Sequence, residues 1–455
     1  MDLFGKNVLV VGAGISGNAA AKLTKKMGAR VILSDSKKEE DIDHDLQDLR
    51  DAGVEIVLGP QSEELLQGID LIILSPAVPV RIPLVQAAYK HDIEVISEVE
   101  FAWRLAESPI LAVTGTNGKT TTVTLLGLLM KTAYDKVGVG GNIGVPLCEE
   151  VLKAGNDGCT VAEISSYQME ASKEFHPHIA AVLNVTPDHV VRHGSLEVYQ
   201  QMKEKLFANQ TAEDYLVLNY DDAKTRSMAN RTKSRVCFFS RLHELEEGAY
   251  LSNDGMLMLA WDGRKMVLLP ASELQIKGGH NIENALAAAA AAYLGGAQPE
   301  HIAEVLRKFA GVEHRIEPVK EINGVMYYND SKATNTDSAI KALESFTDHI
   351  ILIAGGDDKM TDLTDFMMLV KERCDELILV GDAAARFKEA ALKLGIRGQH
   401  IHEAGYSMEK AVQIAHDIAA APQTVLLSPA CASFDMFKGF EERGRVFKEL
   451  VKSLQ

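Results

Sequence analysis

Residues 110–130, ILAVTGTNGKTTTVTLLGLLM, contain the residue types needed to bind a nucleoside triphosphate. A short apolar run is followed by a glycine loop and then by a helical pattern of leucines. Glycines let backbone N–H groups close around phosphate oxygens, and the first amides of a helix add their dipole. Lys119 is placed to reach the terminal phosphates and the Thr120 hydroxyl to bind magnesium. The stretch predicts a phosphate loop, G-x-x-G-K-T, although Val113 stands where the usual loop has its first glycine; a plain glycine turn is the structural alternative.

A second glycine motif lies near the N-terminus. Residues 6–17, KNVLVVGAGISG, predict a strand that ends in Gly12-x-Gly14-x-x-Gly17, and Asp35 follows the next predicted strand, 30–33. This spacing resembles a dinucleotide fingerprint. A NAD site, a nucleotide diphosphate-sugar site and a plain tight turn all fit it. Strand 70–74 ends in SPAVP, where proline stops the strand beside the same ligand edge.

Acidic and basic groups accompany the buried strands of the central region. Glu163 lies among apolar neighbours in the predicted strand 159–166, and Asp188 and His189 follow strand 180–184. An acid in a buried strand is costly without a partner, and a magnesium shell would supply one. Because ligands bind at the carboxyl ends of parallel strands, these groups are expected to converge on the phosphate loop. For His189 alone, a capped or solvent-facing histidine fits equally well.

The predicted helix 195–209 carries a lysine on its apolar stripe. Lys203 is seven residues after Leu196 and four after Tyr199, both of which mark that stripe. Such a lysine either extends its charged end to solvent or has a chemical role, and periodicity leaves both open. Further on, residues 279–284, GHNIEN, precede an alanine-rich helix. Their amides suit an adenine edge, and helix capping fits as well.

Length and composition indicate a three-domain α/β protein. The chain has 455 residues, and about 150 residues per domain gives three. Repeated strand, polar loop and helix patterns predict mainly parallel sheets with flanking helices, in domains spanning residues 1–98, 99–311 and 312–455. The expected types are Rossmann-like, P-loop and Rossmann-like. The net charge of −17 argues against nucleic-acid partners and membrane insertion. Five scattered cysteines and no signal-peptide pattern predict a cytoplasmic protein, which we expect to be a monomer.

Taken together, the motifs resemble one enzyme family. GTNGKTT, AEISSYQ, NVTPDH, YQQMK, HNIEN, HRIE, NDSKATN and GGDDK are similar, in this order, to the motifs of the Mur ligases. These are ATP-dependent amide-bond-forming enzymes of peptidoglycan precursor synthesis, and the resemblance covers the whole chain. The N-terminal GAGISG, NDSKATN and the closing SPACASFDMFKGFEERG resemble the members that add D-glutamate to UDP-N-acetylmuramoyl-L-alanine.

The resemblance implies a set of site residues. Those implied for the UDP-substrate are Gly14, Ile15, Ser16, Asp35, Ser36, Ala77 and Asn142; many relatives have glycine at the Ala77 position. Those implied for ATP are Gly115, Thr116, Asn117, Gly118, Lys119, Thr120, Thr121, Asn281, Asn284, Arg315 and Asp330. Those implied for the incoming amino acid are Lys332, Thr334, Lys359, Ser433 and Phe440. Those implied for magnesium are Thr120, Glu163, His189 and Lys203, the last as a carbamate formed with carbon dioxide, and the catalytic set is Lys119, His189 and Lys203.

The implied chemistry is amide-bond formation through an acyl phosphate. ATP would phosphorylate the L-alanine carboxylate, with Mg²⁺ (two ions are expected) and Lys119 neutralising the transferring oxygens, and the amine of D-glutamate would displace phosphate. Two alternatives remain at this point. One is another ligase of the same fold, such as a folylpolyglutamate synthase. The other is a NAD-dependent oxidoreductase, which would use Gly12 to Asp35 but leaves GTNGKTT and NDSKATN without a role.

Overall fold

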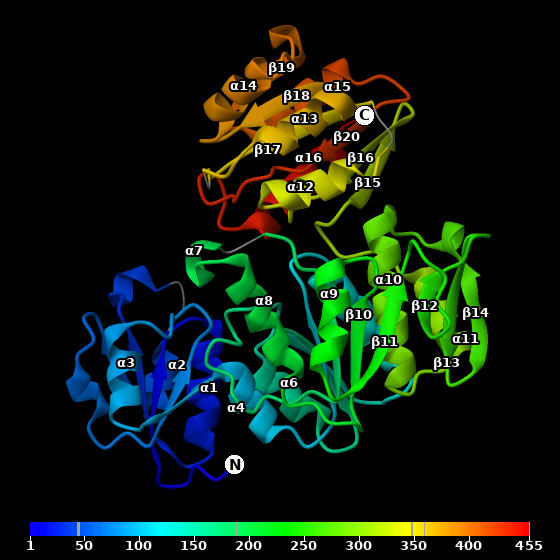
Figure 1. Ribbon diagram of the computed structural model, residues 1–455. Helices are drawn as coiled ribbons and strands as arrows, with labels where there is room; N and C mark the ends of the chain where they lie inside the picture. Colours follow the sequence, from blue (N-terminus) through cyan, green and yellow to red (C-terminus); the bar gives the residue numbers. More distant parts are fainter. Residues whose placement is uncertain (43–45, 188–189, 347–348, 359, 455) are drawn as a thin grey trace. The chain divides into compact units, whose positions relative to one another are not determined.

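The structure is a computed structural model that describes residues 1–42, 46–187, 190–346, 349–358 and 360–454. It contains three sheets, all mainly parallel (Figure 1). The chain divides into two compact units, one formed by Met1–Leu274 with Ile282–Phe309 and the other by Gln275–Asn281 with Ala310–Gln455. The first unit holds two sheets and the second holds one, so the predicted three-domain α/β class is confirmed. The exact boundaries after residues 98 and 311 stay predictions.

The first sheet has five parallel strands in the order β3-β2-β1-β4-β5. The strands are β1 Asn7–Val11, β2 Arg30–Asp35, β3 Glu55–Leu58, β4 Leu71–Leu74 and β5 Glu94–Ser97, with helices α1 Ile15–Lys26, α2 Gln47–Asp51 and α3 Pro83–Lys90. Alternate residues of β1 pack into two different cores: Val8 and Val10 lie with α1, whereas Leu9 and Val11 lie with α3. Both faces are therefore covered, as expected for a parallel sheet. The strand order reverses beside β1, which places a crevice at the carboxyl ends of β1 and β4.

The second sheet has nine strands in the order β14-β13-β12-β11-β10-β9-β6-β8-β7. In chain order they are β6 Ile110–Thr114, β7 Val137–Gly141, β8 Cys159–Glu163, β9 Ile179–Val182, β10 Tyr215–Asn219, β11 Arg235–Ser240, β12 Gly248–Leu251, β13 Met256–Trp261 and β14 Arg264–Pro270. Strands β12 to β14 pair antiparallel, and the others are parallel. The predicted strand 159–166 ends at Glu163 instead, so this carboxylate stands at the ligand edge of the sheet.

Helices surround this second sheet. They are α4 Glu98–Leu105, α5 Lys119–Met130, α6 Leu147–Ala154, α7 Val190–His193, α8 Leu196–Glu204, α9 Ala223–Met228, α10 Gly279–Leu294 and α11 Pro299–Lys308. In α10 the eight alanine and leucine residues 285–292 are all at most 1% exposed, so the alanine-rich stretch is a buried helix. Residues 279–284 lie inside its first turns and not before it. Among the described residues no helix is long and apolar enough to cross a membrane.

The third sheet, in the second unit, has six strands in the order β15-β16-β20-β17-β18-β19. They are β15 Glu317–Ile322, β16 Val325–Asn329, β17 Ile350–Gly355, β18 Cys374–Val380, β19 Ile401–Gly405 and β20 Thr424–Leu427, with helices α12 Thr336–Leu343, α13 Thr364–Arg373, α14 Ala384–Lys393, α15 Met408–Ile418 and α16 Phe440–Ser453. The four predicted strands are present at β16, β17, β18 and β20. The edge strands β15 and β19 were not predicted, because charged residues interrupt their apolar alternation.

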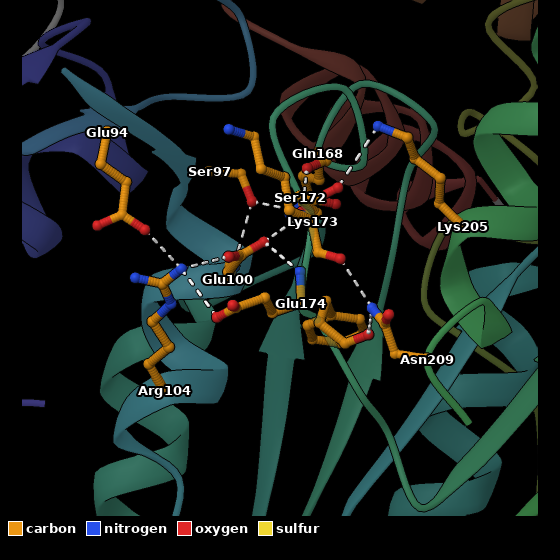
Figure 2. A network of polar contacts seen from close by, with 11 residues as sticks. Glu94, Ser97, Glu100, Arg104, Gln168, Ser172, Lys173, Glu174, Lys205 and Asn209 are labelled. Atoms are coloured by element: carbon orange, nitrogen blue, oxygen red, sulfur yellow. Dashed lines mark hydrogen bonds and ion pairs between the residues drawn. The ribbon is translucent and has the colours of Figure 1, made fainter. Parts of the chain in front are cut away.

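A buried polar network joins the end of the first sheet to the segment after β8 (Figure 2). Glu100 on α4 is fully buried, and its Oε2 accepts hydrogen bonds from the backbone N–H groups of Lys173 and Glu174. Its Oε1 accepts from Arg104 Nη2 at 2.8 Å. The Ser97 and Ser172 hydroxyls are 2.6 Å apart. This network fixes segment 168–174 against α4.

We predict that Glu100→Gln destabilises the protein by about 3–5 kcal/mol, because it leaves the buried donors without a carboxylate. Urea unfolding followed by circular dichroism measures this. Glu174→Gln is the matched control: Glu174 also accepts from Arg104 Nη2, at 3.1 Å, but its side chain is 65% exposed. The control should cost less than about 1 kcal/mol. Equal losses for the two variants would contradict the role given to the buried carboxylate.

Candidate active site

The predicted phosphate loop connects β6 to α5. Gly118 caps α5 with a left-handed backbone, φ +83°, and a Cβ added there would stand 2.2 Å from Asn284 Oδ1. Only glycine fits this position without displacing its neighbour. Lys119 Nζ lies over the loop and donates to the carbonyls of Gly115 and Thr116, both at 2.8 Å. The first amides of α5 and the lysine ammonium thus belong to the same loop, an arrangement that suits anion binding.

Side chains from the neighbouring strand end hold this loop. Asn184, which follows β9, accepts from Asn117 N–H through its Oδ1 at 2.8 Å, and its carbonyl accepts from Thr116 N–H at 3.1 Å. Thr186 N–H donates to Thr116 Oγ1 at 3.1 Å. Asn184 was not among the residues predicted from the sequence. Its only signal there is its place at the end of a strand in the NVTPDH motif.

Glu163 stands at the end of β8, the strand next to β6, and is 2% exposed. Its Oε1 accepts from Asn142 Nδ2 at 2.9 Å, so two residues predicted for different ligands are in contact. Its Oε2 is buried and has no hydrogen-bond partner among the described residues. A buried carboxylate oxygen of this kind fits an Mg²⁺ ligand. Thr120 is the second residue of α5, the helix that follows β6, and is half-buried.

The described part of the chain contains no cluster of three or more His, Cys, Asp or Glu side chains able to hold a metal unaided. Asp188 and His189, the second of them a predicted magnesium ligand, lie outside the described residues.

Lys203 is buried on α8, with 1% of its surface exposed. A lysine that extends to solvent keeps its charged end in water, so that alternative is excluded. Its Nζ lies 4.3 Å from the centre of the Tyr199 ring, and the Tyr199 hydroxyl donates to Thr116 Oγ1 at 3.3 Å. One tyrosine thus connects Lys203 to the phosphate loop. From the sequence, Tyr199 was placed on the apolar stripe and in the YQQMK motif, without a role at the site.

The two asparagines predicted for ATP, Asn281 and Asn284, belong to different units. Asn284, in the first unit, is 4% exposed, and its Oδ1 accepts from Thr122 Oγ1 at 3.3 Å beside Gly118. It therefore packs directly on the phosphate loop. Asn281 belongs to the second unit, where its Nδ2 donates to the Lys277 carbonyl at 2.7 Å.

The edge of the first sheet brings most residues predicted for the UDP-substrate together. Gly14 caps α1, and Ile15 and Ser16 form its first turn, with Ile15 58% exposed. The Asp35 carboxylate accepts from the N–H of Ala13 at 2.7 Å and from that of Lys37 at 2.9 Å, so it shapes the glycine turn. Ser36 and Ala77 are exposed at the same edge. Asn142 is the exception, since it lies beside Glu163.

The second unit carries the residues predicted for the amino acid. Lys332 Nζ lies 5.4 Å from the centre of the Phe440 ring, and Thr334 N–H donates to the Lys332 carbonyl at 2.9 Å. Ser433 is 2% exposed, and its carbonyl accepts from Phe437 N–H at 2.8 Å. Lys359 lies outside the described residues.

Arg443 organises this edge and was not predicted. It is 1% exposed on α16 and donates to the carbonyls of Ser331, Cys431 and Ala432 at 2.7 to 3.1 Å. Burial lowers the pKa of its guanidinium to about 10, which leaves it charged at neutral pH. Its signal in the sequence is its spacing of four residues from the buried Phe447.

Asp330 is a buried carboxylate at the end of β16. Its Oδ2 accepts from Ser428 Oγ at 2.8 Å and its Oδ1 from Ile316 N–H at 3.2 Å. Burial raises its pKa to about 6, against the opposing effect of the positive charge of Arg315.

Family models match the chain along most of its length. They cover residues 6–97 (Mur ligase MurD-like, N-terminal domain), 113–292 (Mur ligase middle domain) and 314–431 (Mur ligase, glutamate ligase domain). A UDP-N-acetylmuramoylalanine--D-glutamate ligase of Thermoanaerobacter sp. (strain X514) is 46% identical over 455 residues, all of both chains. One of Pelotomaculum thermopropionicum is 47% identical over 454 residues, 100% of this chain and 99% of the relative.

Solved structures show the same fold at low identity. A UDP-N-acetylmuramate-alanine ligase of Thermotoga maritima has a TM-score of 0.60 at 20% identity, covering 98% of this chain and 99% of the other. A MurF ligase of Thermotoga maritima, solved with ADP, has a TM-score of 0.60 at 17% identity, covering 100% and 97%. Similarity at this level of sequence identity shows a shared fold and nothing about function.

We predict that the titration of Asp330 lowers the free energy of unfolding as pH rises from about 4 to about 6. In this interval the folded chain still holds the proton that the unfolded chain has lost, so the free energy of unfolding falls as pH rises, by up to about 3 kcal/mol. Asp330→Asn should remove this component in urea unfolding measured across pH 4–7. Asp365→Asn, which alters an exposed carboxylate on α13, should follow the wild type. An Asp330→Asn profile parallel to that of the wild type would refute the assignment.

Proposed function

The chain belongs to the Mur ligase family, and we propose that it joins D-glutamate to UDP-N-acetylmuramoyl-L-alanine with ATP, in peptidoglycan precursor synthesis. The observation that carries this proposal is full-length identity of 42–47% to relatives named for this reaction. The phosphate loop at β6 and α5 supports the ATP requirement.

The proposed reaction proceeds through an acyl phosphate. An amine does not attack a carboxylate directly, so a carboxylate oxygen of the L-alanine end first attacks the γ-phosphorus of ATP and ADP leaves. The amine of D-glutamate then attacks the acyl carbon, and the tetrahedral intermediate collapses with loss of phosphate and a proton. Lys119 and the first amides of α5 would hold the phosphate oxygens during the first transfer.

The donor set near the loop fits magnesium. Glu163, whose Oε2 has no hydrogen-bond partner among the described residues, and the Thr120 hydroxyl would hold the ion, together with His189 and a carbamate on Lys203. Bound Mg²⁺ would neutralise charge on the transferring phosphoryl group. Carbon dioxide converts a lysine amine into a carboxylate, which turns a side chain unable to bind a cation into a ligand. The burial of Lys203 and its link through Tyr199 to the loop support this role.

We assign the UDP-substrate to the edge of the first sheet, where exposed residues surround the glycine turn. The residues proposed there are Gly14, Ile15, Ser16, Asp35, Ser36 and Ala77, with Asn142 toward the acyl end. We place the reaction in the cytoplasm, where ATP is made and thiols stay reduced, because all five cysteines are free.

D-glutamate would bind at the edge of the third sheet through its carboxylates. A nucleophilic amine must stay free, so recognition falls on the acid groups. Lys332 and Lys359 would supply charge, Thr334 and Ser433 hydroxyls, and Phe440 a wall for the aliphatic stem. The contact between Lys332 and the Phe440 ring supports the grouping of these two residues.

We predict that D-glutamate drives ADP release well above L-glutamate, L-lysine or meso-diaminopimelate when ATP and UDP-N-acetylmuramoyl-L-alanine are present. A site built from lysines should reject a basic side chain by a large factor, because burying an unmatched charge is costly. A coupled ADP assay across this panel measures the preference. Faster release with L-lysine or meso-diaminopimelate would mean a different member of the family.

We predict that Lys203→Ala is nearly inactive and that formate restores part of its rate, because a small carboxylate can occupy the place of the carbamate. Lys203→Arg should stay inactive with or without formate, since it keeps the positive charge and forms no carboxylate. Lys224→Ala, which alters an exposed lysine on α9, should behave as wild type. An active Lys203→Arg variant would rule out the carbamate.

A further inference from the structure

Arg192 lies on α7, a helix beside the second sheet, and its side chain reaches the loop that follows β4 of the first sheet. Its Nε and Nη2 bind the two carboxylate oxygens of Glu170, each at 2.8 Å. Its Nη1 donates to the Ala77 carbonyl at 3.2 Å, and its Nη2 also lies 3.5 Å from the Pro76 carbonyl. In return, Arg81 Nη1 donates to the Arg192 carbonyl at 3.1 Å. One guanidinium thus holds a carboxylate on one side and the substrate-side loop on the other.

The geometry of this guanidinium is fixed from several directions. The side chain of Arg192 is 13% exposed and that of Glu170 is 11% exposed. The Arg192 guanidinium carbon lies 4.6 Å from the centre of the Tyr167 ring, which supports the planar group from its face. A bidentate, stacked and mostly buried arginine is strongly oriented.

Glu170 is itself held by the segment that the network of Figure 2 fixes. Lys205 Nζ donates to the carbonyls of Met169 at 2.9 Å and Glu170 at 3.1 Å. Ser172 Oγ donates to the Gln168 carbonyl at 2.9 Å. The backbone at Glu170 is therefore fixed by hydrogen bonds. Arg192 connects this fixed segment to the loop at Pro76 and Ala77.

The loop that Arg192 holds forms part of the proposed UDP-substrate edge. It packs on the glycine turn, since a Cβ added at Gly12 would lie 2.7 Å from Ser75 Cβ. Next to the Arg192–Glu170 pair, which we call the clamp, a pocket of about 240 Å³ lies between Val80, Val198 and Met202. Apolar packing therefore does not fill this side of the loop. On this side of the loop, the polar contacts of Arg192 hold the carbonyls of Pro76 and Ala77.

We infer that Arg192 is a positioning residue for the UDP-substrate: with Glu170 it holds loop 75–79 in the shape that receives this ligand. The inference rests on the proposed function. It assigns Arg192 no contact with the reacting atoms. Loss of the clamp should weaken binding of the UDP-substrate. The phosphate loop should still bind ATP, since among the described residues the hydrogen bonds of the Arg192 side chain go to Glu170, Pro76 and Ala77.

The test uses Arg192→Lys in the full-length protein. Lysine keeps the charge beside Glu170, which protects the fold, but one ammonium lacks the fork needed to hold the carboxylate and the loop carbonyls together. The matched control is Arg231→Lys. Arg231 makes the same forked pair with Glu204, at 3.0 and 2.7 Å, away from the first sheet, and its side chain is 43% exposed.

Calorimetric titration gives Kd for UDP-N-acetylmuramoyl-L-alanine and for ATP, and hydrogen–deuterium exchange follows residues 75–82. We expect Arg192→Lys to raise the Kd of the UDP-substrate about tenfold, a loss of about 1.4 kcal/mol, and to speed exchange in that segment. The Kd for ATP and all values of Arg231→Lys should stay within about twofold of wild type.

An unchanged Kd for the UDP-substrate would overturn the inference. So would an equal loss of ATP affinity, which would indicate general destabilisation, or weaker binding without faster exchange in residues 75–82. Wild-type protein that binds ATP but not the UDP-substrate would instead refute the proposed function, and this inference with it.

Discussion

At Gly118, the turn between β6 and α5 has no room for a side chain, and residues from distant parts of the first unit pack against this point. Gly118 takes a left-handed backbone against Asn284, and Asn184 holds the preceding amides through its side chain and its carbonyl. Asn184 thus fixes the first part of the loop, and the first amides of α5, which have no acceptor within the helix, are the donors that suit phosphate oxygens. Glu163, at the end of the strand next to β6, and the buried Lys203 on α8, which contacts the loop through Tyr199, both lie beside it. The proposed phosphate site is therefore built around this loop.

Buried charge is the second theme of the molecule, and it has two different explanations. Arg443 is surrounded by backbone carbonyls that satisfy its donors, so it stabilises the edge of the third sheet by itself. Glu163 keeps one oxygen without a hydrogen-bond partner among the described residues, a state that is costly unless a ligand compensates it. Structural need explains the first residue, whereas the proposed magnesium site would explain the second.

Several features of the fold and site could be predicted from the sequence, because they depend on local pattern. Buried strands, the phosphate loop and the position of Lys203 on an apolar stripe all follow from periodicity within one element. Arg443 carries the same local signal as Lys203, a basic residue at the spacing of a buried face. Periodicity cannot separate their roles, since these depend on what lies opposite each side chain.

Contacts between distant segments could not be predicted. Arg192 meets Ala77 across 115 residues of chain, and Asn184 meets Asn117 across 67. Asp35 also differs from the fingerprint's expectation: both its oxygens bind backbone amides of its own edge, which makes it a loop-shaping residue as well as a proposed ligand contact. The edge strands β15 and β19 gained their pairing from neighbours that no single-strand pattern reveals.

The acyl-phosphate mechanism is tested most directly by the fate of the substrate's carboxylate oxygens. UDP-N-acetylmuramoyl-L-alanine carrying ¹⁸O in its terminal carboxylate is incubated with ATP, D-glutamate and the protein, and the released phosphate is analysed by mass spectrometry. If the carboxylate attacks the γ-phosphorus and phosphate later leaves from the acyl carbon, each phosphate released carries a single ¹⁸O atom from the substrate. Unlabelled phosphate, or AMP as the nucleotide product, would contradict the acyl-phosphate mechanism and the role given to the phosphate loop.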